Sequence, residues 1–130
     1  MKKMFAILLL FLILVAVCTF EEIYFHSFVA EFSQRSTVLS QSIKTNEDNL
    51  NVYETKQNYS SLKKYWDESK KRICFLANYE KIKSMDESFI KLNVALETND
   101  KALAYENSAI IENCKEFFNY IIGFNINNLF

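Results

Sequence analysis

The chain of 130 residues contains no proline and only one glycine, Gly123. These two residues are the strongest helix breakers, so a chain that lacks them has few places where a helix must stop. Lysine, glutamate, leucine, isoleucine and asparagine are abundant instead, and such a composition mostly forms helix. We therefore predict an all-α fold, with an N-terminal transmembrane helix followed by an antiparallel bundle of about three helices.

Histidine is equally scarce, because His26 is the only one. A Ser-His-Asp arrangement could be assembled only through His26, and we find no acid at helical spacing that suggests such a site. A proton-sensing role would use a pKa near neutrality, whereas the simpler interpretation is a polar residue at a membrane interface. The paired acids are sequence neighbours that diverge on a helix. We predict no catalytic residues, no cofactor and no enzymatic activity.

The three cysteines, Cys18, Cys74 and Cys114, form no Cys-x-x-Cys pair and no Cys/His cluster, so we predict no metal site. Cys74 and Cys114 both lie beyond the apolar N-terminal run, in a region where a disulfide could persist if the domain is exported. Helical phase places Cys114 at the centre of an apolar face and Cys74 at the edge of its own. Two separate thiols are therefore the favoured prediction, with a disulfide as the alternative.

A long uncharged run is the most informative feature that is present. Residues Met4 to Phe20 carry no charge, Lys2 and Lys3 precede them, and two glutamates follow. At 1.5 Å per residue the run covers roughly 25 Å, slightly less than a hydrocarbon core of about 30 Å. Because positive charge stays on the cytoplasmic side, we predict an uncleaved anchor over residues 1–22, with the N-terminus inside and an extracytoplasmic domain over residues 23–130.

A cleaved signal peptide is the main alternative, because it has the same basic start and apolar middle. Its cleavage would require small residues, and the best position, after Cys18, is a poor site. Cys18 also raises the possibility of a lipoprotein, but Val17 stands where a small side chain is expected. Cleavage would leave a secreted helical protein.

Apolar spacing beyond the run predicts four helical segments. The membrane helix should continue from Met4 to about Lys44, a second helix should cover about 49–77, and a bend should fall between Leu76 and Ile82. The capping-box pattern from Ser84 to Glu87 suggests a slightly later start for the third helix. The last helix should run from a turn at 98–100 to about Ile122, ending at Gly123, with the tail packing back. The expected inward residues are Phe25, Phe28, Phe32, Val38, Leu39, Ile43, Tyr59, Leu62, Trp66, Ser69, Ile73, Leu76, Ile82, Met85, Phe89, Leu92, Leu96, Leu103, Ile110, Cys114, Phe117, Phe118 and Ile121.

Five aromatic residues are the candidate anchors of a core or an interface. They are Tyr59, Tyr65, Trp66, Phe75 and Tyr79. Trp66 is central to its predicted helix face, which favours core packing. A partner-binding groove is the alternative, because aromatic side chains serve well as interface anchors.

Charge gives little support for nucleic acid as a partner, since the chain has 15 basic and 16 acidic side chains and a net charge of −1. One mildly basic stretch could meet anionic lipid headgroups or cell-wall polymers: Lys63, Lys64, Lys70, Lys71 and Arg72. Asp67 and Glu68 lie within it, so a solvated helix face is the simpler interpretation.

The segment from Tyr53 to Phe130 resembles a bacterial, membrane-anchored family known as domain of unknown function 4363. The matching features are Trp66 in a lysine-rich helix, Ile73, the pattern Ile82-x-x-Met85-Asp86-x-Ser88-x-x-x-Leu92, and the tail Phe124-Asn125-Ile126-Asn127-Asn128-Leu129-Phe130. Relatives often carry an Asp-His pair where this chain has Asn78-Tyr79, so a site that depended on that histidine would be absent here. The resemblance implies the architecture and membrane location, brings no activity, and points weakly to a small multi-pass membrane protein as a partner.

These observations lead to two hypotheses for function. The first is a non-enzymatic interaction or accessory protein that sits in the lipid bilayer and docks on another membrane protein or on itself. The second is a sensor-like bundle that binds a small ligand between its helices, which would need a cavity lined with polar groups.

Overall fold

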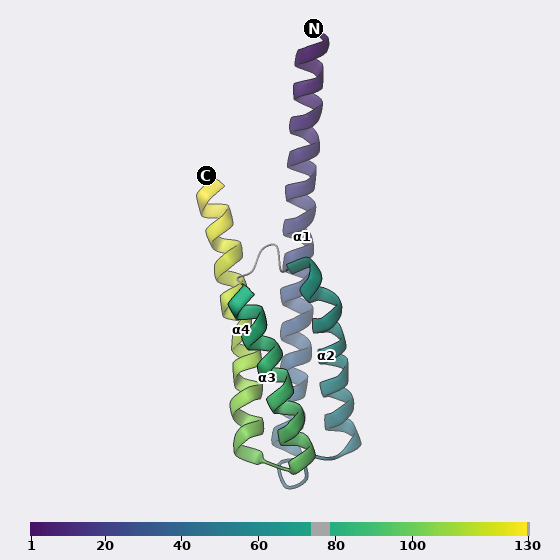
Figure 1. Cartoon of the computed structure of the whole chain (residues 1–130), viewed down its shortest axis with the longest axis vertical. Coiled ribbons are helices and arrows are strands. Elements are labelled where there is room, and N and C mark those ends of the chain that lie inside the picture. Colours follow the sequence, from purple (N-terminus) through teal and green to yellow (C-terminus); the bar gives the residue numbers. More distant parts are fainter. Residues whose placement is uncertain (74–78, 130) are drawn as a thin grey trace.

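The computed structural model describes residues 1–73 and 79–129, with side chains described as far as Phe118. These residues form four helices, which are α1 (Lys2–Thr45), α2 (Tyr53–Ile73), α3 (Tyr79–Thr98) and α4 (Lys101–Leu129). The helices run alternately down and up, so that each lies antiparallel to its neighbours in one bundle (Figure 1). The all-α prediction is confirmed: the long, apolar first helix extends into the bundle, and three further helices complete it.

The first helix, α1, is continuous over 44 residues. It contains neither proline nor glycine, and its residues therefore offer no position that would kink it. The helix ends at Asn46, whose backbone N–H and side-chain amide each donate a hydrogen bond to the Ser42 carbonyl, at 3.0 Å in both cases. The predicted continuation from the apolar run to about Lys44 is confirmed.

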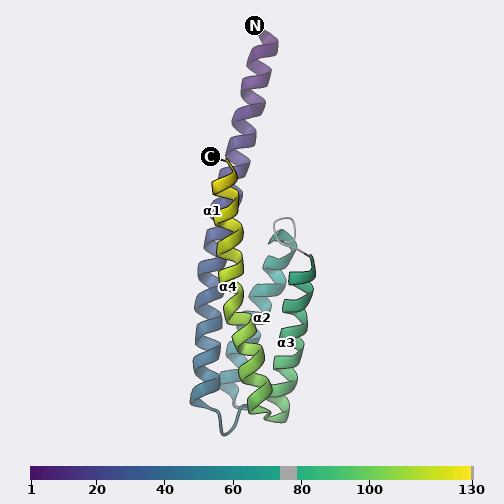
Figure 2. The same cartoon turned by 90° about the vertical axis from the view of Figure 1, so that its left-hand side faces the viewer.

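The two halves of α1 have different surroundings. The first half extends beyond the bundle in both views (Figures 1 and 2), and every residue from Met1 to Ile23 is exposed. The second half lies within the bundle, where it packs against α2 and α4. α3 packs against α4 and makes a smaller contact with α2. The bundle is therefore built on the second half of α1.

Large side chains from all four helices fill the core. Those that are almost wholly buried are Trp66, Phe28, Phe32, Phe89, Phe118, Leu39, Ile43, Leu50, Leu62, Ile73, Met85 and Leu92. The inward residues predicted for α3 are all buried. Leu76 and Ile121 are outside the part of the chain whose side chains are described, and the bend predicted after Leu76 falls largely on the undescribed residues 74–78.

Two inward predictions were wrong. Val38 is 44% exposed and Ile110 is 38% exposed, whereas Ile111 is buried. The spacing of apolar residues predicted a buried face of α4 that is slightly rotated from the observed one. Two polar residues, Asn107 and Ser108, occupy part of the observed buried face. Each satisfies its own hydrogen bond locally: Asn107 donates to the Leu103 carbonyl at 2.9 Å, and Ser108 donates to the Tyr105 carbonyl at 3.2 Å.

Three helix boundaries also differ from the sequence prediction. α2 begins at Tyr53 rather than near 49, because Asn46 to Val52 form a longer connection. α3 begins at Tyr79, so Ser84 lies inside the helix and the capping-box interpretation was wrong. α4 continues to Leu129, past Gly123, which has no positive φ; the predicted end at Gly123 was therefore wrong, and the tail extends the helix instead of packing back.

The two turns at the far end of the bundle are tied together. Asn99 adopts a left-handed conformation with φ 57°, which asparagine tolerates better than most residues. Its Oδ1 accepts a hydrogen bond from the Leu50 backbone N–H at 2.9 Å, so the α3–α4 turn holds the α1–α2 connection. Asp100 then caps α4 by accepting from the Leu103 N–H at 3.1 Å. The turn predicted at 98–100 is confirmed.

Candidate functional site

Trp66 is the centre of the aromatic core. It is fully buried, and its ring lies 5.9 Å from that of Phe32 and 6.2 Å from that of Phe89. Its indole Nε1 donates a hydrogen bond to Asp86 Oδ1 on α3 at 2.7 Å, so the one polar atom of the side chain is satisfied inside the bundle. The structure thus places Trp66 in the core and not on a partner surface.

Tyr59 lies at the edge of the core, where it links α2 to α3. Its ring packs edge-on against Phe89 at 6.1 Å, and its hydroxyl donates to the Phe89 carbonyl at 2.9 Å. Burial raises the pKa of Tyr59 to about 12, with smaller contributions from Asp67 and Glu97. The neutral hydroxyl is therefore the form present, and it acts as a structural donor.

Tyr65 lies at the α1–α2 contact. Its ring stacks on that of Phe28 on α1, with centroids 5.8 Å apart and planes at 12° to each other. The guanidinium of Arg35, also on α1, lies 4.9 Å from the centroid of the Tyr65 ring. Arg35 is held in place by Glu31 at 2.7 Å and by the Ser61 hydroxyl at 2.6 Å. Burial, followed by the nearby Glu31, raises the pKa of Tyr65. This arrangement fixes α1 against α2.

Tyr79, the fourth described candidate, lies apart from the three aromatic residues above. Tyr79 is 77% exposed in the first turn of α3. Phe75 lies outside the described residues. The four described candidates therefore do not form one binding groove.

A larger aromatic cluster lies near the end of the bundle from which the apolar half of α1 extends, and sequence reasoning did not single it out as a site. Phe118 on α4 packs edge-on against three phenylalanines of α1, with centroids 5.8 Å from Phe25, 5.3 Å from Phe28 and 6.1 Å from Phe32. The four residues had each been predicted to point inward. Their shared location was not apparent, because Phe118 is distant in the sequence.

A polar contact crosses the seam between α1 and α4 on the same side of the core. Glu112 accepts hydrogen bonds from the Ser40 hydroxyl at 3.0 Å and from the Thr37 hydroxyl at 3.5 Å. Ser40 is buried and Glu112 is partly buried. With two hydroxyl donors the carboxylate is satisfied, so this contact serves to align α1 and α4.

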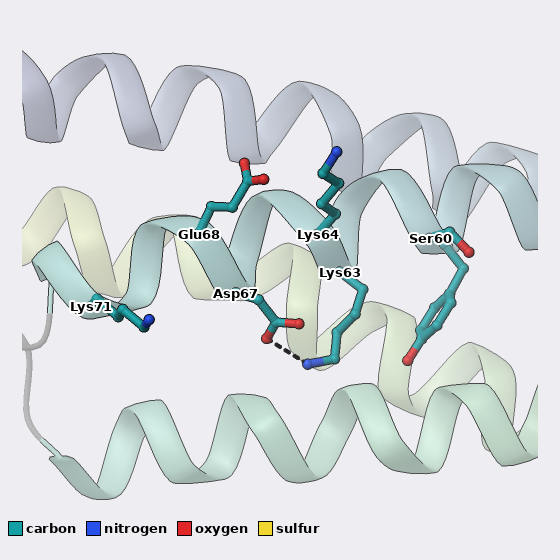
Figure 3. A pocket seen from close by; sticks show the side chains of 7 residues that line it. Ser60, Lys63, Lys64, Asp67, Glu68 and Lys71 are labelled. Carbon is teal, nitrogen blue, oxygen red and sulfur yellow. Dashed lines mark hydrogen bonds and ion pairs between the residues drawn. The ribbon is translucent and has the colours of Figure 1, made fainter.

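The outer face of α2 carries an open depression of about 610 Å³ (Figure 3). It is lined by Tyr59, Ser60, Lys63, Lys64, Asp67, Glu68 and Lys71. Lys63 pairs with Asp67 at 2.6 Å, and Lys70 pairs with Asp67 at 3.5 Å and with Asp86 at 3.4 Å. Its charges are of both signs, which fits a solvated face. It is an open surface depression and not the chamber between helices that a ligand sensor needs.

His26 and Cys114 are two further chemically active side chains that the structure describes. His26 lies 3.9 Å from Glu22, an acid at four-residue spacing that the sequence interpretation discounted, but both side chains are about half exposed. Within residues 1–73 and 79–129 no group of three His, Cys, Asp or Glu could hold a metal ion. Cys114 is a free, buried thiol, and burial raises its pKa to about 11. Cys74 lies outside the described residues.

Apolar surface is the feature of this molecule that most needs an explanation. The segment from Met4 to Phe20 is exposed throughout, and α1 is the one described helix long and apolar enough to cross a membrane. On the bundle itself, Ile90 is 61% exposed and Val94 is 45% exposed, and their four-residue spacing puts them on the same face of α3.

Comparison with known proteins gives a family but no activity. The chain belongs to the family described as Domain of unknown function (DUF4363), whose model matches residues 23–129. The family predicted from the sequence is thereby confirmed. No curated protein and no solved structure matches the chain. The matched range contains the whole bundle and omits almost all of the exposed apolar half of α1.

Proposed function

From the membership of a family defined only as a domain of unknown function, and from the geometry above, we propose that the protein is a single-pass membrane protein. Its bundle stands outside the cytoplasmic membrane and serves as a non-enzymatic interaction or accessory domain. The single observation that carries the proposal is the structure of α1, a continuous helix of 44 residues. Its first half exposes an uncovered apolar surface, while its second half is a central part of the core.

The exposed half of α1 fits a bilayer better than water. The run from Met4 to Phe20 has seventeen uncharged residues, nearly all of them apolar, and leaving them exposed to water would forfeit a large hydrophobic free energy, since each fully buried Leu, Ile or Phe side chain contributes about 1.5–3 kcal/mol. Lys2 and Lys3 at the start favour an inside N-terminus by the positive-inside rule. The bundle then lies on the outer side, directly continuous with the span.

Protease protection tests this placement. The full-length protein in sealed membrane vesicles is digested from the bundle side, and the products are identified by mass spectrometry. We expect a protected fragment that contains Lys2 to Phe20. A mature protein whose N-terminus begins after Cys18 would instead establish cleavage and a secreted helical protein, and would refute the anchor.

The interaction role is supported by the apolar face of α3. Ile90 and Val94 both remain exposed on this face, at 61% and 45% of their surface. A photo-crosslinking residue at Ile90 tests whether that face docks in native membranes, with the same residue at Lys64 on the exposed face of α2 as the matched control. We expect one discrete product from position 90, either a dimer of this chain or a complex with one membrane protein. Equal, diffuse labelling from both positions would refute the docking role.

A further inference from the structure

The C-terminal end of α4 is placed unusually for the end of a soluble bundle. α4 continues to Leu129 and extends past the end of α2 and the start of α3, in the same direction as the N-terminal half of α1 (Figures 1 and 2). Since the described parts of α2 and α3 stop short of it, they do not surround this part of α4. Among the described residues, the last turns of α4 therefore share their level only with α1.

The contacts of Phe118 set that level. Its ring packs against Phe25, Phe28 and Phe32, so Phe118 is level with about the middle of these three residues. The two helices are antiparallel, and each residue adds about 1.5 Å along the axis. Leu129 lies eleven residues further on, or about 16 Å, and the same distance back along α1 leads from Phe28 to Val17. The end of α4 thus reaches the level of the outermost turn of the apolar run.

The sequence of this end has the composition of a membrane interface. No charged residue occurs from Phe117 to Phe130, and the last turn of α4 contains no basic residue. Solvent-exposed helices of soluble proteins usually carry charge, and their C-termini often carry Lys or Arg. The segment instead combines phenylalanine, tyrosine, isoleucine and leucine with four asparagines, a mixture of apolar, aromatic and neutral polar groups suited to headgroup depth.

We propose that the end of α4, residues 119–129, is a second membrane contact that enters the headgroup region of the leaflet facing the bundle. The occupant is the lipid bilayer itself, because the segment's level coincides with the end of the proposed span and its lack of charge suits lipid. The inference rests on the proposed membrane anchor of α1. It adds that the bundle contacts the membrane at two places, through α1 and through α4.

Depth-dependent fluorescence quenching tests this contact on the full-length protein reconstituted in phosphatidylcholine vesicles. Cys18, Cys74 and Cys114 are replaced by Ser, Ser and Ala, and one cysteine is introduced for an NBD fluorophore. The test position is Ile126→Cys. Leu10→Cys within the span and Asn51→Cys at the far end of the bundle are the two controls. Quenching is measured with lipids that carry a nitroxide in the headgroup or deep in the acyl chain.

The expected result is strong quenching of position 126 by the headgroup nitroxide, at least about threefold greater than at position 51, as for a group within the interface. Position 10 should be quenched by the deep nitroxide. Quenching at position 10 without quenching at position 126 would overturn this inference and leave the anchor intact. Absence of quenching at both positions would overturn the proposed anchor as well. A blue-shifted but unquenched probe at position 126 would indicate a protein contact and would also overturn the inference. Far-UV circular dichroism of each labelled variant checks that the bundle is folded.

Discussion

The hydrogen bond between Trp66 and Asp86 should contribute measurably to the stability of the bundle. The Trp66 side chain is fully buried, and its indole Nε1–H donates a hydrogen bond to Asp86 Oδ1, with 2.7 Å between the two heavy atoms. In Asp86→Ala the indole N–H would lose its acceptor inside the core. Leaving a buried donor unsatisfied costs about 1–3 kcal/mol, so we expect a loss of that size in the free energy of unfolding. Asp86→Asn keeps an acceptor and should cost about half as much.

Urea unfolding of the full-length protein in detergent micelles, followed by far-UV circular dichroism, gives the free energies. With an m-value of about 1–3 kcal/mol/M, a loss of about 2 kcal/mol shifts the midpoint by roughly 1 M. Because Trp66 is the only tryptophan, its fluorescence provides a second probe in every variant that retains it. The two probes should report the same midpoint.

A double-mutant cycle isolates the bond from the other effects of each substitution. Trp66→Phe removes the donor, and it also leaves space in the core. In that background Asp86→Ala should cost about 1–2 kcal/mol less than in the parent. Glu31→Ala, which breaks the exposed pair with Arg35 on α1, is the matched control and should show no coupling to Trp66→Phe. If Asp86→Ala costs the same in both backgrounds, the bond is not the source of the stability.

Two further predictions follow from the turn and the buried thiol. Asn99 has a φ of 57° and accepts a hydrogen bond from the Leu50 N–H. Both Asn99→Ala and Asn99→Gly lose the acceptor, but only alanine is also strained at this φ, so Asn99→Ala should be less stable than Asn99→Gly by about 1 kcal/mol in thermal unfolding. Equal melting temperatures of the two variants would contradict this account. The pKa of Cys114 is raised to about 11 from 9.0 because burial disfavours the thiolate. At pH 8, iodoacetamide should therefore modify Cys114 about a hundredfold more slowly in the folded protein than in urea. Mass spectrometry of a variant with serine at positions 18 and 74 measures the two rates. Similar rates in both states would show that the thiol is accessible. The same shift makes the thiol's contribution to folding complete below pH 9 and lost progressively as the pH rises from 9 to 11.

The fold could be predicted largely from the spacing of apolar residues, because helices that bury one face repeat that pattern. Phe28, Trp66 and Phe89 were each predicted to point inward, and all three are buried. The errors came from polar residues that a hydrophobic pattern cannot assign. Asn107 can be buried because its side-chain amide donates a hydrogen bond within its own helix. The buried face of α4 therefore includes Asn107 and leaves the apolar residue Ile110 partly exposed.

Helix ends were the least predictable feature, for a related reason. The pattern from Ser84 to Glu87 is compatible with a helix start, yet it lies inside α3, where Asp86 is needed by Trp66 of another helix. Gly123 could have ended α4, but a single glycine costs only about 1 kcal/mol within a helix and does not force a break. Such choices depend on contacts between segments that are distant in the chain. The clustering of Phe118 with the phenylalanines of α1 was hidden for the same reason.

Because α1 is unbroken, a tilt of its apolar half is transmitted directly to the bundle. From Glu21 to Thr45 the helix extends about 36 Å, and no proline, glycine or turn in this segment provides a joint. A tilt of the apolar half by about 10° would therefore move the far end of the bundle sideways by about 6 Å, as rigid-rod geometry requires. In the proposed membrane placement, changes in bilayer thickness, which alter the tilt of a spanning helix, would be converted into lateral displacement of the turns at Asn46 and Asn99.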